Sequence, residues 1–133
     1  MTEDSKDIIE QDLNKAINFL GQNKFSEAES ICNEIIKDKD NADAYHILSS
    51  IKLYKQEFDE SIKLVNKSIE INDDNPGYYV TQGCAHSASK DYKNSVKAFK
   101  KAVSLNDEVA QVHFYLGESY RKLKKYNDAI ASF

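Results

Sequence analysis

The sequence predicts an all-α fold in which pairs of antiparallel helices follow one another along the chain. Only 4 Gly and 1 Pro occur in 133 residues, which is too few for a turn-rich β fold and suits helices joined by short connections. An aromatic residue recurs at steps of 33, 34 and 34 residues along the chain, at Phe25, Phe58, Tyr92 and Tyr126. A period of this length is typical of a solenoid, in which each repeat buries one face on its neighbours.

Two further positions keep the same period. A small residue stands three places after each aromatic, at Ala28, Ser61, Ser95 and Ala129. The pairs Leu48-Ser49, Gln82-Gly83 and Leu116-Gly117 also recur with this interval. Small residues at these places allow two helices to approach closely, and a larger side chain would force them apart.

The clearest copy of the repeat lies between His113 and Phe133. Leu116, Gly117 and Tyr120 form L-G-x-x-Y, and Ala129 with Phe133 forms A-x-x-x-F. These are the two halves of the tetratricopeptide signature, with His113 where the family prefers Trp. The chain therefore resembles the tetratricopeptide repeat (TPR) family. The resemblance implies a right-handed superhelical solenoid of antiparallel helix pairs, with about 3.5 repeats in a single domain over residues 1–133.

The first repeat is expected at about residues 9–41, after a lead-in at 1–8. Asp4 or Ser5 is expected to cap its first helix, because a short side-chain oxygen can accept from the free N–H groups of the first turn. That helix should run to about Leu20, where Gly21 can adopt a positive φ and stop it. The second helix should run from Phe25 to about residue 37.

The later repeats are expected at about 42–75, 76–109 and 110–133, the last incomplete. Pro76 suits the first turn of a helix, where its missing N–H has no partner. The helices of the second and third repeats are expected at about 42–55, 58–71, 76–89 and 92–105. In the fourth repeat we expect one helix to end near Lys122 and another to begin near Tyr126.

Membership of the TPR family would place the first helix of each repeat along a concave groove that binds an extended peptide or a partner's helix. The groove positions are expected to be Glu10, Leu13, Ile17, Leu20, Asp43, His46, Ser50, Leu53, Val80, Cys84, Ser87, Gln111, Phe114, Glu118 and Arg121. Exposed Leu53, Val80 and Phe114 would suit an apolar peptide or helix. The alternative is that these side chains pack the helices against one another.

Chaperone-binding members of the family clamp a C-terminal carboxylate with a Lys/Asn/Asn/Lys/Arg set. The corresponding places in the first three repeats hold Leu13, Ile17, Ile47, Gly77 and Thr81. In the last three repeats they hold His46, Ser50, Thr81, Gln111 and Tyr115. No place matches, so we expect no heat-shock-chaperone carboxylate clamp.

Charge and composition argue against several other classes of partner. The net charge is −4 and the pI about 5.4, whereas nucleic-acid binding needs a basic face. No apolar run approaches the ~20 residues that span a bilayer. The first residues are acidic and polar, without a basic segment followed by an apolar one, so we expect no signal peptide, no membrane partner and a cytoplasmic location. Two cysteines, Cys32 and Cys84, are too few for a disulfide framework, and Cys32 should be a buried thiol.

No motif for catalysis, a cofactor or a metal stands out. The sequence lacks G-x-S-x-G, a P-loop and G-x-G-x-x-G, and its three His residues show no metal-ligand spacing. The prediction is therefore a non-enzymatic scaffold for protein–protein interaction. One alternative is the non-catalytic arm of a larger enzyme, such as a glycosyltransferase or sulfotransferase. Ala129, Ile130 and Phe133 lie on an unfinished last helix, so we hypothesise that the chain is a fragment of a longer one. The alternative is self-association, in which a second copy covers this open C-terminal end.

Overall fold

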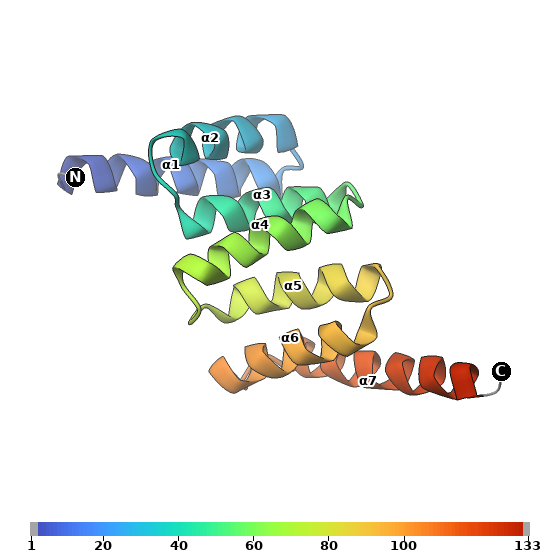
Figure 1. The fold of residues 1–133 in the computed structure, drawn as a ribbon. Coiled ribbons are helices and arrows are strands. Elements are labelled where there is room, and N and C mark those ends of the chain that lie inside the picture. Colours follow the sequence, from blue (N-terminus) through green and yellow to red (C-terminus); the bar gives the residue numbers. More distant parts are fainter. Residues whose placement is uncertain (1–2, 132–133) are drawn as a thin grey trace. The chain divides into compact units, whose positions relative to one another are not determined.

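The computed structural model describes the backbone of residues 3–131 and the side chains of residues 5–127. All regular structure in this part of the chain is α-helical. The chain forms two compact units, Met1–Asn72 and Asp73–Phe133. The first unit holds α1 (Glu3–Gly21), α2 (Phe25–Asp38), α3 (Ala42–Tyr54) and α4 (Phe58–Ile71), and the second holds α5 (Pro76–Ala88), α6 (Tyr92–Leu105) and α7 (Ala110–Ala131) (Figure 1).

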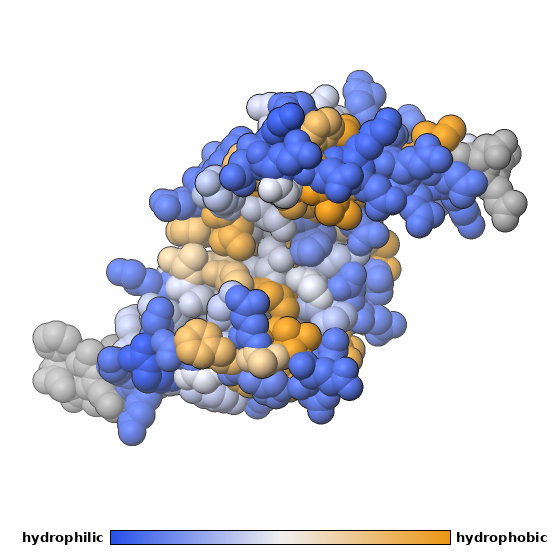
Figure 2. Space-filling view, turned by 180° about the vertical axis from the view of Figure 1, so that it is seen from behind, coloured by the Kyte–Doolittle hydropathy of each residue, from blue (hydrophilic) through white to orange (hydrophobic). Residues whose placement is uncertain are grey.

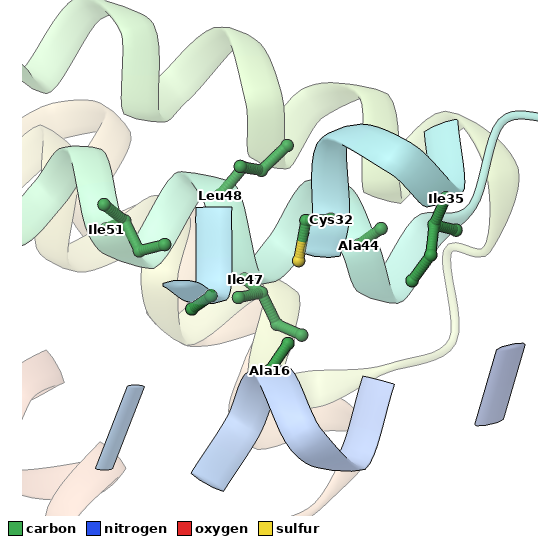
Figure 3. Close-up of a cluster of buried hydrophobic side chains, with 8 residues drawn as sticks. Ala16, Cys32, Ile35, Ala44, Ile47, Leu48 and Ile51 are labelled. Carbon is green, nitrogen blue, oxygen red and sulfur yellow. The ribbon is translucent and has the colours of Figure 1, made fainter. Parts of the chain in front are cut away.

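The core of the first unit lies between α1, α2 and α3. Its buried members are Ala16, Ala28, Cys32, Ile35, Ala44, Ile47, Leu48 and Ile51 (Figure 3). Ala16 of α1 and Ala28 of α2 are fully buried, and they are the first-repeat counterparts of Ser49 and Ser61. Cys32 is fully buried as expected, and burial raises the pKa of its thiol to about 12. A thiol in this state is a packing group rather than a nucleophile.

The helix pair α3–α4 is joined at its point of closest approach by two serines. The Ser49 hydroxyl donates to the Ser61 carbonyl at 2.7 Å, and the Ser61 hydroxyl donates to the Ser49 carbonyl at 2.9 Å. Both serines are fully buried. Because each hydroxyl finds an acceptor on the facing helix, the small residues here hold the pair together as well as leaving room for it.

In the second unit, α5 and α6 approach each other at Gly83. A Cβ at Gly83 would lie 2.6 Å from the ring of Phe99, so no side chain fits there unless the ring moves. Phe99 is 2% exposed, and its ring centroid lies 5.5 Å from that of Tyr115 on α7. The Ser95 and Ser119 hydroxyls are 2.8 Å apart and link α6 to α7.

The turns within the first three repeats share one backbone feature. Asn23, Gln56 and Lys90 have φ of 61°, 64° and 66°, and they occupy the same position of successive repeats. This left-handed conformation costs a non-Gly residue roughly 1–2 kcal/mol. Packing of the second helix on the first must offset that cost, since neither Gln nor Lys favours the conformation locally.

The N-terminal helix differs from its prediction at both ends. α1 begins at Glu3, so Asp4 and Ser5 lie inside the helix rather than capping it, and most of the expected lead-in is helical. Gly21 does end the helix, but no glycine has a positive φ among the described residues, and Asn23 takes that conformation instead. Capping by Asn is seen further along, where the Asn41 side chain accepts from the Ala44 N–H at 2.9 Å.

The predicted break between Lys122 and Tyr126 is wrong. α7 runs without interruption from Ala110 to Ala131, through the position where Asn23, Gln56 and Lys90 turn the chain. A turn at Lys124 would carry the same cost in φ, and packing of a second helix on the first would have to offset that cost. Continuing the helix keeps the backbone hydrogen bonds without that cost.

The uninterrupted α7 also changes the surroundings of Gly117. We expected Gly117 to lie against a second helix of its repeat, yet a Cβ there would meet nothing within 4 Å. His113, which stands where the family prefers Trp, is exposed, and its Nε2 lies 2.8 Å from the Asp107 carbonyl oxygen. The side chains of Ala129, Ile130 and Phe133, on which the expected open end depends, lie outside the described residues.

Candidate functional site: the groove positions

Seven of the eight groove positions expected in the first unit surround one groove between α1 and α3. The groove has a volume of about 440 Å³. Its lining residues are Glu10, Leu13, Asn14, Ile17, Leu20, Asp43, His46, Ile47 and Ser50. Leu13 and Ile17 are one helical turn apart on α1, and His46 and Ser50 are one turn apart on α3, so both helices present one face to the same space. Leu53, one turn further on α3, is half-buried and does not line the groove.

The apolar side chains of this groove differ in how much they contribute to the core. Leu13 and Leu20 are half-buried and pack against the core of the first unit. Ile17 lies between them and is 52% exposed, which is unusual for a large aliphatic side chain. The expected alternative, that these residues pack helix on helix, therefore applies to Leu13 and Leu20, whereas Ile17 still has a free apolar surface.

The polar members of the groove carry negative or no charge. Glu10 and Asp43 are exposed, and neither Lys nor Arg lines the groove. Burial lowers the pKa of His46, and the nearby Asp43 carboxylate partly opposes that shift. His46 is therefore neutral at pH 7, and the formal charges in the lining are the two carboxylates.

The expected positions on α5 form one half-buried stripe. Val80, Cys84 and Ser87 follow each other at steps of four and three residues, so they share a face of α5. Burial raises the pKa of the Cys84 thiol, which makes it less reactive than an ordinary surface cysteine. This stripe therefore offers a small apolar surface with one hydroxyl.

The positions on α7 are more open. Phe114 is 64% exposed, with its ring centroid 6.3 Å from that of Tyr115. Arg121 donates to both carboxylate oxygens of Glu118, at 2.7 and 3.2 Å. This bidentate pair lowers the pKa of Glu118 and raises that of Arg121. Each of the two side chains thus already has an oppositely charged partner.

An exposed apolar surface that was not predicted lies near the start of α1. Ile9, Ile35 and Ile71 line a hollow of about 420 Å³, and Ile8, which is 57% exposed, lines another of about 480 Å³. In the sequence, the adjacent isoleucines Ile8 and Ile9 could have indicated this apolar surface, but they lie at the boundary between the expected lead-in and the first repeat. Figure 2 shows hydrophobic side chains at the surface among hydrophilic ones.

Two kinds of site are not found where the structure describes the chain. No group of three or more His, Cys, Asp and Glu side chains between residues 5 and 127 could hold a metal ion. No helix within residues 3–131 is long and apolar enough to cross a membrane.

The helix pairs and their repeat length agree with a known family. The family model described as tetratricopeptide repeat matches residues 42–75 and 76–108, which together are about half of the chain. This chain belongs to the tetratricopeptide repeat family. TPR domains are generally modules for protein–protein interaction and are typically non-catalytic. No curated protein sequence matches the chain.

Solved structures of TPR domains have the same fold. The first TPR domain of human RPAP3 superposes with a TM-score of 0.83 at 16% identity, over 90% of this chain and 95% of that one. The first TPR of Spaghetti (RPAP3), bound to the HSP90 peptide SRMEEVD, gives 0.80 at 17% identity, over 87% and 93%. A mutant O-GlcNAc transferase of Thermobaculum terrenum gives 0.84 at 18% identity, over 90% of this chain but 23% of the transferase. Likeness at these identities establishes the fold.

Proposed function

We propose that the groove between α1 and α3 binds an apolar stretch of an extended peptide or of a partner's helix. The observation that carries the proposal is Ile17, which is 52% exposed within a groove whose other aliphatic side chains are half-buried or buried. Covering an aliphatic side chain with an apolar partner removes its surface from water and contributes about 1.5–3 kcal/mol when burial is complete. The domain is then a scaffold that acts through this groove rather than a catalyst.

The charge around the groove favours a partner with cations beside its apolar residues. Glu10 and Asp43 flank the apolar floor, and no cationic side chain lines it. Residues 1–72 hold 9 Lys and no Arg against 15 Asp and Glu, a formal charge of −6. Complementary charge speeds encounter and selects the partner more than it adds affinity. We therefore propose a segment with Lys or Arg on either side of aliphatic residues.

Two isoleucines of similar exposure provide a matched test. Ile17 in the groove is 52% exposed, and Ile71 at the end of α4 is 48% exposed and lies outside the groove. Short peptides selected from a displayed random library are titrated against the wild-type chain, Ile17→Ser and Ile71→Ser by fluorescence anisotropy. Ile17→Ser should weaken binding on the order of tenfold, because it removes the exposed apolar contact, while Ile71→Ser should change little.

The selected sequences test the charge argument separately. Enrichment of Lys or Arg beside aliphatic residues is expected, together with weaker binding as salt is raised. Equal effects of the two Ile substitutions would move the binding surface away from the groove. Selected peptides that are anionic would contradict the proposed partner chemistry even if the groove is used.

A second candidate function is the non-catalytic arm of a larger enzyme. The observation that favours it is the likeness to the O-GlcNAc transferase, of which the matching part is 23% of the chain. In that case the groove would hold a protein substrate rather than a scaffold partner. The coding sequence beyond the codon for Phe133 distinguishes the two, since a catalytic domain in the same reading frame favours the second.

A further inference from the structure

α7 carries a bare copy of a face that is covered in the preceding repeats. Tyr45 and Tyr79 are 7% and 8% exposed, while His113, at the same repeat position, is exposed. Gly83 is buried, while Gly117, at the same position of the next repeat, is exposed with open space at its Cβ position. Tyr120, which completes L-G-x-x-Y, is 46% exposed. The face has the residue pattern that packs against a second helix in the preceding repeats, but no helix within residues 3–131 lies against Gly117.

The second unit shows what fills such a face. The ring of Phe99 occupies the space that the missing Cβ of Gly83 leaves. Phe133 follows Gly117 at the same separation in sequence as Phe99 follows Gly83. However, α7 continues without a turn from Gly117 to Ala131, about 21 Å along the axis, so α7 does not fold back over its own Gly117. The segment that fits the face must come from a turned chain or from another molecule.

We propose that residues 126–133 of a second copy of this chain cover the Gly117 face of α7, and that the first copy does the same in return. Exchange of an identical element between two protomers reproduces contacts that the sequence already encodes. Gly117 and Phe133 lie equally far from Lys125, so two antiparallel α7 helices would pair about a two-fold axis near that residue. Each copy then supplies both a face and its cover.

The sequence of the exchanged segment argues for a second copy rather than an unrelated helix. Tyr126, Ala129 and Phe133 repeat the spacing of Tyr92, Ser95 and Phe99, which form the packed helix of the preceding repeat. Tyr126 is 54% exposed, whereas Tyr92 at the same repeat position is half-buried. Tyr126 therefore has exposed aromatic surface at a position where the preceding repeat packs its side chain. The exposed face of α7 around Gly117 is the corresponding surface for it to pack against.

A pair of glycines allows the proposal to be tested without disturbing the single chain. Gly117 and Gly21 are both exposed and have open space at the Cβ position, so a side chain can be added at either without a clash at Cβ. The molar mass is measured by light scattering over a range of protein concentrations. The buffer contains salt, because the proposed two-fold axis brings the two Lys125 side chains close together and salt screens their repulsion. The wild type should approach twice the 15.2 kDa of one chain. Gly117→Leu should weaken association about tenfold or more, because the Leu side chain would occupy the space proposed for Phe133 of the second copy. Gly21→Leu should not weaken association.

Disulfide formation reports which residues meet. Gly117→Cys and Phe133→Cys are made separately in a Cys84→Ser background, where the remaining Cys32 is fully buried. Mixing the two should give a mixed disulfide faster than either forms one with itself. A dimer that survives Gly117→Leu, or no preference for the mixed disulfide, would overturn the exchange.

A monomer at every concentration would also overturn the proposal. In that case, a lower melting temperature for Gly117→Leu than for Gly21→Leu would show that residues 126–133 fold back on their own chain. Equal melting temperatures would leave the face uncovered.

Discussion

Gly83 sets the distance between α5 and α6. A Cβ at this position would be 2.6 Å from the Phe99 ring, and atoms at that distance repel strongly. The ring cannot move away freely, because it is 2% exposed and packs against Tyr115. The same repeat position holds Ala16 and Ser49 earlier in the chain, so the size tolerated there depends on which side chain faces it.

Gly83→Ala is therefore expected to destabilise the second unit. Overpacking of this kind costs roughly 1–3 kcal/mol, which exceeds the gain in helix propensity from Gly to Ala. The urea midpoint of unfolding, followed by circular dichroism, measures the change. Gly21→Ala is the control, since its Cβ meets nothing within 4 Å, and it should stay within about 0.5 kcal/mol of the wild type. Equal midpoints for the two variants would contradict the close approach at Gly83.

At the scale of helices, α3 and α4 are joined by hydrogen bonds from a serine side chain on each helix to the backbone of the other. The hydroxyls of Ser49 and Ser61 each donate to the carbonyl of the other residue. The two helices are therefore close enough for a side chain as short as Ser to reach the backbone of the facing helix. The fully buried Ala16 and Ala28 occupy the same positions in the first repeat. The repeat thus accepts either a small apolar pair or a hydrogen-bonded polar pair.

Substitutions of Ser61 should separate the two roles of that contact. Ser61→Ala removes a buried hydrogen bond and is expected to cost about 1 kcal/mol. Ser61→Val also adds volume between the helices and should cost roughly 1–3 kcal/mol more. Ser104 is exposed on α6, and Ser104→Val should have an effect within about 0.5 kcal/mol in the same urea experiment. If Val is tolerated at residue 61 as well as Ala, the helices do not approach as closely as described.

The helix boundaries show which features can be predicted from local sequence and which cannot. The starts of α2 to α7 were predicted correctly, because Phe25, Phe58 and Tyr92 mark the repeat period and Pro76 suits the first turn of a helix. The turn within the fourth repeat was not, since Lys124 there and Lys90 in the third repeat are the same residue type. Only the packing available to the following helix decides whether that position turns.

For the whole molecule, the distribution of charge bears on the class of peptide it accepts. The places at which chaperone-binding TPR domains carry the cationic clamp hold uncharged residues such as Leu13, Ser50 and Thr81. Residues 1–72 carry a formal charge of −6. An acidic peptide with a free C-terminal carboxylate would gain no ion pair at the clamp places and would be repelled by the surrounding charge.

We therefore expect no saturable binding of the peptide SRMEEVD, although a structural neighbour of the same fold is seen bound to it. Isothermal titration calorimetry of this peptide into the chain measures the interaction directly. The first TPR of Spaghetti (RPAP3) serves as the positive control under the same conditions. Tight binding that weakens steeply with salt would contradict the prediction and indicate that other cations replace the clamp.

The amino-acid sequence by itself determined the family and the order of helices, because the repeat period and the local signals at helix starts need no knowledge of distant contacts. It also placed Leu13, Ile17, His46 and Ser50 on faces that the structure brings together. Tertiary structure alone decided that Ile17 stays exposed beside a half-buried Leu13, that Gly117 has open space where Gly83 has a ring, and that α7 continues. Exposure and continuity depend on what packs against a residue, and the same residue type at the same repeat position can have different neighbours.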